Sequence, residues 1–315
     1  MGSELKGKVC GVGWLLAVVA VAAPYVCRGQ TEVAFQPAAQ KYIGARGMSL
    51  GNAIGSDGED IESMYQNPAT LSFLRSANVM IDHRQGLGNQ IFQENIAGRL
   101  FTGRFGALGL GIGVEHSGKF TQSGPFKFLQ SDLDVGYSFR VMSVSTDLSV
   151  GMLGNFRTEK DDSASRSAAR FSVGLMYSPS AGTSYSVIYR GLGSDISYSA
   201  RDLAGSRFTQ GGVDRLARSL EIGSTLRYPS LTGPPFLTAS IAGEKDFVER
   251  IVRVRGGLEV ILANIVSLRV GYVGALVGEF RYGIGLSIAG LKFDFGAMPL
   301  LGSGRYEELT LKFAL

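Results

Sequence analysis

The sequence has few of the residues on which catalytic and metal centres usually depend. Its 315 residues include only two histidines and two cysteines, and Cys10 and Cys27 both lie within the first 29 residues. A disulfide framework, a cysteine-ligated metal site and a cysteine nucleophile are therefore excluded for the rest of the chain. No H-x-x-x-H spacing is present, so we expect neither a metal nor a cofactor.

Proline and charge of one sign are also scarce. Nine prolines and a hydrophobic fraction of 45% argue against a disordered chain, and 31 basic against 27 acidic residues leave a formal net charge of +4. No basic run with interleaved aromatics occurs, so we expect no nucleic-acid partner. Glycine, with 44 residues, is about twice as frequent as usual and lacks the three-residue repeat of collagen. The fold therefore favours many positions without a side chain.

Residues 1–29 are typical of a secretory signal peptide. Two lysines precede the apolar stretch Val12–Ala23, which is too short to span a bilayer as a helix. Cleavage after Gly29 is the first choice, and cleavage at the end of the apolar stretch is the second. A lipoprotein acylated at Cys27 is a further alternative, which the bulky Val26 before it disfavours.

After residue 76 the chain becomes a series of alternating segments separated by turn residues. One face of each segment is apolar, as in Leu108, Leu110, Ile112 and Val114. The other face has glycine, small polar residues and charges, as in Asp132, Asp134, Gly136, Ser138 and Arg140. A soluble sandwich also alternates. Aromatic residues at the ends of the apolar rows, and glycine and arginine on the opposite face, favour a membrane barrel.

The pattern predicts an all-β fold, a transmembrane antiparallel β-barrel of about fourteen strands over residues 77–315, and twelve or sixteen strands stay open. An N-terminal hatch segment over residues 30–76 is expected in its lumen. The predicted strands are residues 78–84, 90–101, 105–117, 131–141, 146–157, 168–178, 183–190, 219–228, 236–243, 250–261, 265–273, 279–288, 291–298 and 306–315.

The connections between these strands differ in length in a way that indicates their orientation. If the first strand runs outward, every second connection is periplasmic, and these connections are short. The longer connections, residues 118–130, 158–167 and above all 191–218, then fall on the external side. We therefore expect a large external loop over residues 191–218, in a protein of the outer membrane of a Gram-negative bacterium.

The segment that precedes the barrel resembles a known family. Residues 44–54, G-A-R-G-M-S-L-G-N-A-I, are similar to the G-A-R-A-x-G-M-G-G-A-F opening of the PorV/PorQ family, which belongs to the FadL-like outer-membrane barrels. Residues 59–60 fall on the family's acidic pair, and residues 65–71 fall on its Y-x-N-P-A-G-L. The matching residues are Gly44, Ala45, Arg46, Gly51, Ala53, Glu59, Asp60, Tyr65, Asn67, Pro68, Ala69 and Leu71.

The resemblance implies that this segment folds into the barrel as a hatch. Its acidic stretch faces an inferred lumen wall with eight arginines, Arg140, Arg170, Arg190, Arg227, Arg253, Arg255, Arg269 and Arg281. We hypothesise that arginine–carboxylate pairs tie hatch and wall together, in which case charge reversal at Asp60 raises ion leakage. In the alternative, the arginines pair with wall acids such as Asp134, Glu221 and Glu259.

Three functions are compatible with such a barrel. The resemblance implies a non-catalytic component of type IX protein secretion or cell-surface attachment, with secretion-system proteins or exported cargo as partners. The wider fold implies a FadL-like channel for uptake of hydrophobic small molecules, surrounded by outer-membrane lipid. A phospholipase-like barrel enzyme is disfavoured, because His83 and His116 lie near predicted strand ends and Asp82 points away from His83. We expect the first function, with the channel as the alternative, and no enzymatic activity.

Overall fold

The computed structural model describes most of the chain after the expected signal peptide. The described residues are 43–74, 78–86, 91–103, 106–117, 129–142, 147–160, 164–193, 196–201, 207–214, 218–228, 236–275, 278–300 and 304–314. The expected signal peptide and residues 30–42 and 75–76 of the expected hatch lie outside them.

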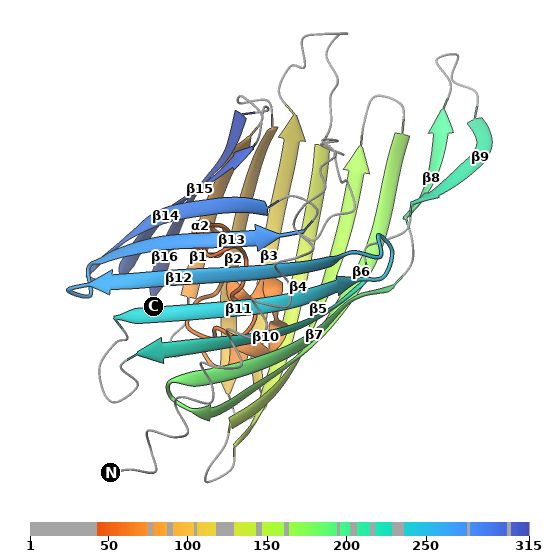
Figure 1. The fold of residues 1–315 in the computed structure, drawn as a ribbon. Coiled ribbons are helices and arrows are strands. Elements are labelled where there is room, and N and C mark those ends of the chain that lie inside the picture. The colour runs from red at the N-terminus through yellow and green to blue at the C-terminus, as the bar shows by residue number, and fades with distance from the viewer. Residues whose placement is uncertain are drawn as a thin grey trace.

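Sixteen strands form one sheet, and all but the two of a projecting hairpin close into an antiparallel barrel of fourteen (Figure 1). The barrel closes where Asn78 of the first strand pairs with Ala314 of the last. The prediction of about fourteen strands is confirmed. The strands are β1 (Asn78–Gly86), β2 (Ile91–Gly103), β3 (Gly106–Ser117), β4 (Leu129–Met142), β5 (Asp147–Lys160), β6 (Ala164–Ser180), β7 (Thr183–Gly193), β8 (Ile196–Arg201), β9 (Arg207–Asp214), β10 (Ser219–Tyr228), β11 (Leu237–Asp246), β12 (Val252–Leu262), β13 (Val266–Gly274), β14 (Gly278–Ile288), β15 (Leu291–Leu300) and β16 (Gly304–Ala314).

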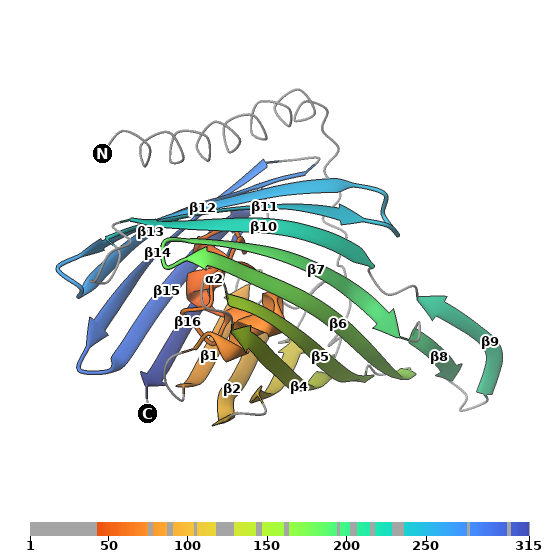
Figure 2. The same ribbon diagram turned by 90° about the horizontal axis from the view of Figure 1, so that it is seen from below.

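The prediction of one large loop over residues 191–218 is wrong. β7 continues to Gly193, and β8 and β9 form a hairpin that projects beyond the barrel (Figures 1 and 2). β8 pairs with the first residues of β6, which is 17 residues long and begins six residues before its pairing with β7 starts at Arg170. β8 alternates Ile196, Tyr198 and Ala200 with polar residues over only six residues, and β9 has no apolar row. The alternation was therefore too short to predict a strand pair here.

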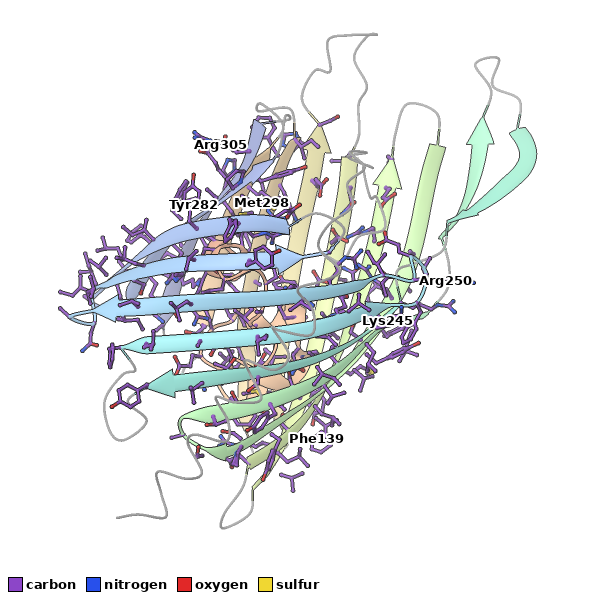
Figure 3. All side chains as sticks on the ribbon, viewed as in Figure 1. Phe139, Lys245, Arg250, Tyr282, Met298 and Arg305 are labelled. Carbon is purple, nitrogen blue, oxygen red and sulfur yellow. The ribbon has the colours of Figure 1, made fainter. Side chains whose placement is uncertain are left out.

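The outward face of the barrel is apolar and exposed. Ile112 is 62% exposed, Ile222 60% and Phe280 68%, and many outward residues on the other strands are similar. Figure 3 shows this outer layer of side chains, with Phe139 and Tyr282 projecting from the wall. An apolar surface of this extent is stable in lipid and not in water. None of the helices in the described part of the chain is long and apolar enough to cross a membrane.

Residues 43–74, here called the N-terminal segment, lie inside the barrel (Figures 1 and 2). The segment comprises α2 (Ala45–Ser49), α3 (Ser63–Gln66) and the 3₁₀ helix η2 (Pro68–Ser72). The Asn67 side chain accepts a hydrogen bond from the Ala69 amide (3.1 Å) and so begins η2, while Pro68 occupies its first turn. Most apolar side chains of the segment are fully buried, so the densest hydrophobic packing of the protein lies here.

Wall glycines explain why the segment fits so closely. A Cβ atom on Gly257 would lie 2.6 Å from the Leu50 carbonyl oxygen, and one on Gly109 would lie 2.6 Å from the Met64 sulfur. Each such Cβ would overlap an atom of the segment. The wall glycines that face the segment in this way are Gly109, Gly111, Gly136, Gly151, Gly174, Gly257, Gly271, Gly283 and Gly296. Much of the glycine excess is therefore clearance for the N-terminal segment.

We predict that Gly151→Ala weakens the seating of the segment, because the new Cβ overlaps the backbone of Pro68 and Ala69. Overpacking of this kind costs about 1–3 kcal/mol. Gly243→Ala is the matched control, because a Cβ on Gly243 meets nothing within 4 Å. Thermal unfolding in detergent, followed by circular dichroism, should show a lower midpoint for the first variant only. Equal midpoints would contradict the close-approach account.

Candidate functional site

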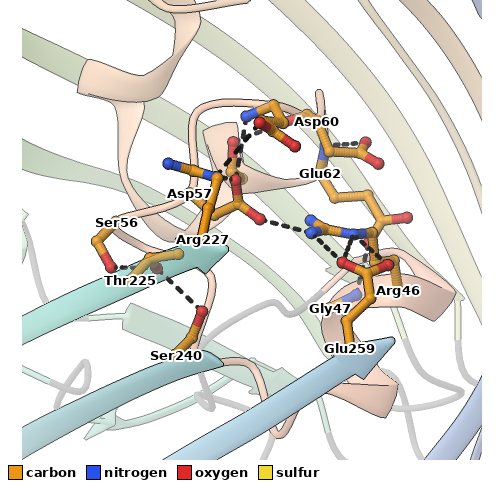
Figure 4. A network of polar contacts seen from close by, with 12 residues as sticks. Arg46, Gly47, Ser56, Asp57, Asp60, Glu62, Thr225, Arg227, Ser240 and Glu259 are labelled. Carbon is orange, nitrogen blue, oxygen red and sulfur yellow. Dashed lines mark hydrogen bonds and ion pairs between the residues drawn. The ribbon is translucent and has the colours of Figure 1, made fainter. Parts of the chain in front are cut away.

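The candidate site is the interface between the N-terminal segment and the inner wall. The loop that follows α2 brings Ser56 against a polar patch on β7, β10 and β11. Ser184 donates to the Ser56 carbonyl (2.5 Å), and the hydroxyls of Ser56 and Thr225 lie 2.8 Å apart (Figure 4). Ser240 continues this row, 2.9 Å from Thr225. Hydrogen bonds of small side chains therefore fix the loop tip and place the following acidic residues.

Arg46 of α2 lies at the centre of a buried ion-pair network (Figure 4). Its guanidinium donates to Asp57 of the segment (2.6 Å) and to Glu259 of β12 (2.7 Å). Asp57 also accepts from Arg227 of β10 (2.6 Å), which in turn lies 3.3 Å from Glu59. Ion pairs this deeply buried are costly to break one partner at a time, at about 3–5 kcal/mol.

The network continues along the wall to the last strand. Glu259 pairs with Arg269 of β13 (2.6 Å), and Arg269 pairs with Asp294 of β15 (2.6 Å). Asp294 accepts from the ammonium of Lys312 on β16 (2.7 Å). The network therefore connects the segment to β10, β12, β13, β15 and β16.

Lys312 closes the network by returning to the segment. Its ammonium contacts Asp60 at 2.6 Å and Glu62 at 2.5 Å. The carboxylates of Asp60, Glu62 and Asp294 lie close enough together to hold a metal ion. The ammonium of Lys312 contacts all three carboxylates, so it supplies positive charge where a metal ion would otherwise do so.

Four carboxyl groups of the segment have shifted pKa values. For Asp60, burial raises the pKa, but Lys312 and Lys292 outweigh burial and lower it. Burial raises the pKa of Asp57, but the guanidinium groups of Arg46 and Arg227 outweigh burial and hold it well below its ordinary value. Burial raises the pKa of Glu62 to about 7, with Asp60 and Asp294 adding to the rise and Lys312 opposing it. Burial and the nearby Asp57 also raise the pKa of Glu59.

A second group of contacts fixes the start of α2. The amide of Gly44 donates to Glu308 (2.9 Å), and the amide of Ala45 donates to the Thr310 hydroxyl (2.7 Å). Arg84 of β1 pairs with Glu308 at 2.8 Å. These are amides at a helix start that have no intrahelical partner, so the wall supplies their acceptors.

Of the eight arginines predicted to line the lumen, Arg227 is the one that forms an ion pair with a carboxylate of the segment in the described structure. Arg190 and Arg255 donate to segment carbonyls, those of Gln66 (2.7 Å) and Asn52 (3.2 Å). Four of the other five form ion pairs with wall acids: Arg269 with Glu259 and Asp294, Arg253 with Asp246, Arg281 with Glu279, and Arg140 with Asp147. Arg140 also lies over the Phe73 ring of the segment, 4.6 Å from its centroid. The fifth, Arg170, contacts Asn155 of the wall at 3.5 Å.

The residues matched by the family resemblance all lie within the segment. Gly44, Ala45 and Arg46 form the start of α2, and Gly51 and Ala53 form the turn after it. Tyr65, Ala69 and Leu71 are buried against the wall, whereas Asn67 ties η2 to β6 by donating to the Leu175 carbonyl (3.1 Å). Glu59 and Asp60 differ: the Glu59 side chain is 43% exposed, and that of Asp60 is 4% exposed.

Reasoning from the sequence did not identify Lys312, Glu308 and Thr310 as partners of the segment. All three lie on the inward face of the last strand, alternating with the outward Leu309, Leu311 and Phe313. The period-two pattern marks their face. It does not indicate which of the inward residues lies at the depth of the segment.

The two histidines lie on the outward face, away from the segment. His83 of β1 contacts Glu94 of β2 at 2.6 Å in an exposed cross-strand pair. The ring of His116 stacks on Phe92 at 5.4 Å. Both rings therefore lie on the outer surface of the barrel, near the ends of their strands.

Comparison with solved structures gives several barrels of the same fold. A FadL homologue of Pseudomonas aeruginosa shares 10% identity and a TM-score of 0.59, over 86% of this chain and 98% of that one. The CymD monoaromatic hydrocarbon channel shares 10% identity and a TM-score of 0.56, over 87% of this chain and 97% of that one. The Pseudomonas putida toluene transporter TodX shares 13% identity and a TM-score of 0.52, over 85% of this chain and 96% of that one. No protein-family model matches the chain, and no curated protein matches it either.

These likenesses establish the class of fold. The chain shares the fold of these barrels: it is a closed antiparallel β-barrel of fourteen strands with an apolar exterior. At such low identity, the likeness says nothing of the particular solute or partner.

We predict that Asp60→Lys loosens the segment, because it places a second ammonium beside Lys312 and removes one of its carboxylates. The loss should reach about 3–5 kcal/mol and raise ion conductance in planar bilayers. The double variant Asp60→Lys/Lys312→Asp restores opposite charges and should lower the conductance again.

The control for this charge reversal is Glu249→Lys, in an exposed pair with Arg253 outside the network, which should conduct as the wild type does. The same conductance in the wild type and Asp60→Lys would show that these ion pairs do not hold the segment.

Proposed function

We propose that the protein is an outer-membrane channel that admits hydrophobic small molecules, with the N-terminal segment as its barrier. The fold carries this proposal: the chain matches, over 85–87% of its length, proteins described as a toluene transporter and a monoaromatic hydrocarbon channel. We further propose that residues 1–29 direct export and that lipid surrounds the mature barrel.

The segment supports this function as the element that controls passage. Its polar groups contact strands around the barrel, from β16 through β12 and β10 to β7. A hydrophobic solute cannot replace the partner of a buried charge, because unpaired charge inside a protein is costly. Passage therefore requires the segment to shift as a unit or the solute to move past it along the wall.

A second candidate is a component of type IX secretion or cell-surface attachment. The similarity of residues 44–71 to the PorV/PorQ motif supports it, as does the β8–β9 hairpin that projects beyond the barrel (Figure 1). A strand pair outside the barrel offers backbone groups to a protein partner. The comparisons with solved structures favour the channel over this role.

Uptake of radiolabelled toluene tests the two functions. A Gram-negative host that lacks its own hydrocarbon channel should take up toluene faster when it makes this protein, and uptake of sucrose should stay unchanged. In parallel, the tagged protein is purified from detergent-solubilised membranes. Unchanged toluene uptake, together with co-purified secretion-system proteins, would refute the channel and favour the second candidate.

A further inference from the structure

The contacts of Lys312 join two parts of the protein that are far apart in sequence. Asp60 and Glu62 come from the N-terminal segment, whereas Lys312 and Asp294 come from β16 and β15. The Glu62 side chain is fully buried, and its second oxygen accepts a hydrogen bond from the Gly47 amide (2.7 Å). Glu62 therefore contacts α2 and the wall at once.

The network that contains Glu62 has more carboxylates than cations. Its ion pairs join four cations to six carboxylates. The cations are Arg46, Arg227, Arg269 and Lys312, and the carboxylates are Asp57, Glu59, Asp60, Glu62, Glu259 and Asp294. With every group ionised, the network has two negative charges in excess, since six minus four is two. The Glu59 side chain is 43% exposed, so the buried part of the network has five carboxylates, four cations and one negative charge in excess. Buried excess charge of this kind is costly, and binding one proton relieves it.

Around Glu62, three carboxylates share one ammonium, so negative charge exceeds positive charge there. The groups that act on Glu62 are Lys312 of β16, Asp294 of β15, and Asp60 and the Gly47 amide of the segment. Further charged groups act on these neighbours and not on Glu62 itself: Lys292 and Arg46 on Asp60, and Arg269 on Asp294. Lys312 already serves Asp60 and Asp294, so one ammonium serves three carboxylates. A protonated Glu62 keeps its acceptor for Gly47 and gains a donor toward its acidic neighbours.

We propose that Glu62 is a proton-sensitive latch between the N-terminal segment and the wall: the protonated carboxyl holds the segment in place, and the ionised carboxylate loosens it from β15 and β16. The inference rests on the proposed function in taking the segment as the barrier of the channel. It adds the regulation of that barrier by protons.

The direction of the pH dependence follows from the surroundings of Glu62. Burial, with Asp60 and Asp294 against Lys312, raises its pKa from about 4.5 to about 7 in the seated state. Because the pKa of Glu62 is raised in the seated state, its protonated carboxyl stabilises the seated segment fully below about pH 4.5. That contribution is lost as pH rises through about 7. The segment is therefore held tightly in acid and more loosely in mild alkali.

Ion conductance of the mature protein in planar bilayers, with potassium chloride as the only solute, tests the latch between pH 5 and pH 8. We expect the wild-type conductance to rise over this range, with a slope of at most about tenfold per pH unit for a single carboxyl. Glu62→Gln, which mimics the protonated group, should stay at the low, acid level throughout. Glu279→Gln, in a wall pair with Arg281 outside the network, should behave as the wild type does.

Each outcome decides the question. A wild-type conductance that does not change between pH 5 and pH 8 overturns the latch, whether or not Glu62→Gln folds. A rise that persists unchanged in Glu62→Gln overturns it as well. Because the assay contains no hydrophobic solute, its result is independent of toluene uptake. Toluene uptake without a pH-dependent conductance refutes the latch alone, and the reverse result refutes the proposed solute alone.

Discussion

The seating of the N-terminal segment against the inner wall is the contact on which the rest of this structure depends. A closed barrel satisfies its own backbone hydrogen bonds and so can be apolar outside. Its inner face then has many charged side chains with little water around them, and these need partners. The segment supplies such partners through Arg46, Asp57, Asp60 and Glu62, while wall glycines give it room.

This seating combines tight packing with electrostatic imbalance. Hydrophobic side chains and backbone contacts fix where the segment lies, because overlap with the wall leaves no alternative register. The ion pairs contribute less to net stability than their number suggests, because burying each charge costs most of what pairing returns. Their effect is to make the position of the segment sensitive to charge, which suits the proposed barrier of a channel because a barrier must stay in place and also shift during passage.

The barrel could be predicted from the sequence to a large extent, because apolar residues alternate with small or polar residues along the strands of the barrel. The β8–β9 hairpin was missed because β8 alternates over only six residues and β9 has no apolar row. The sequence predicted that wall cations pair with the acidic residues of the segment, but it identified few of those cations. Arg227 contacts Asp57 as predicted, whereas Asp60 and Glu62 contact Lys312, which was not predicted. Alternation indicates a face, whereas pairing depends on depth along the barrel, which the turns and bulges set.

Hydrogen exchange of the detergent-solubilised mature protein at pH 6 measures the central claim directly. The account predicts that the buried amides of residues 43–74, among them Gly44, Ala45 and Gly47, exchange as slowly as amides in the neighbouring strands β15 and β16. Exchange of these amides at the rate of an unfolded peptide, while the strands stay protected, would contradict it.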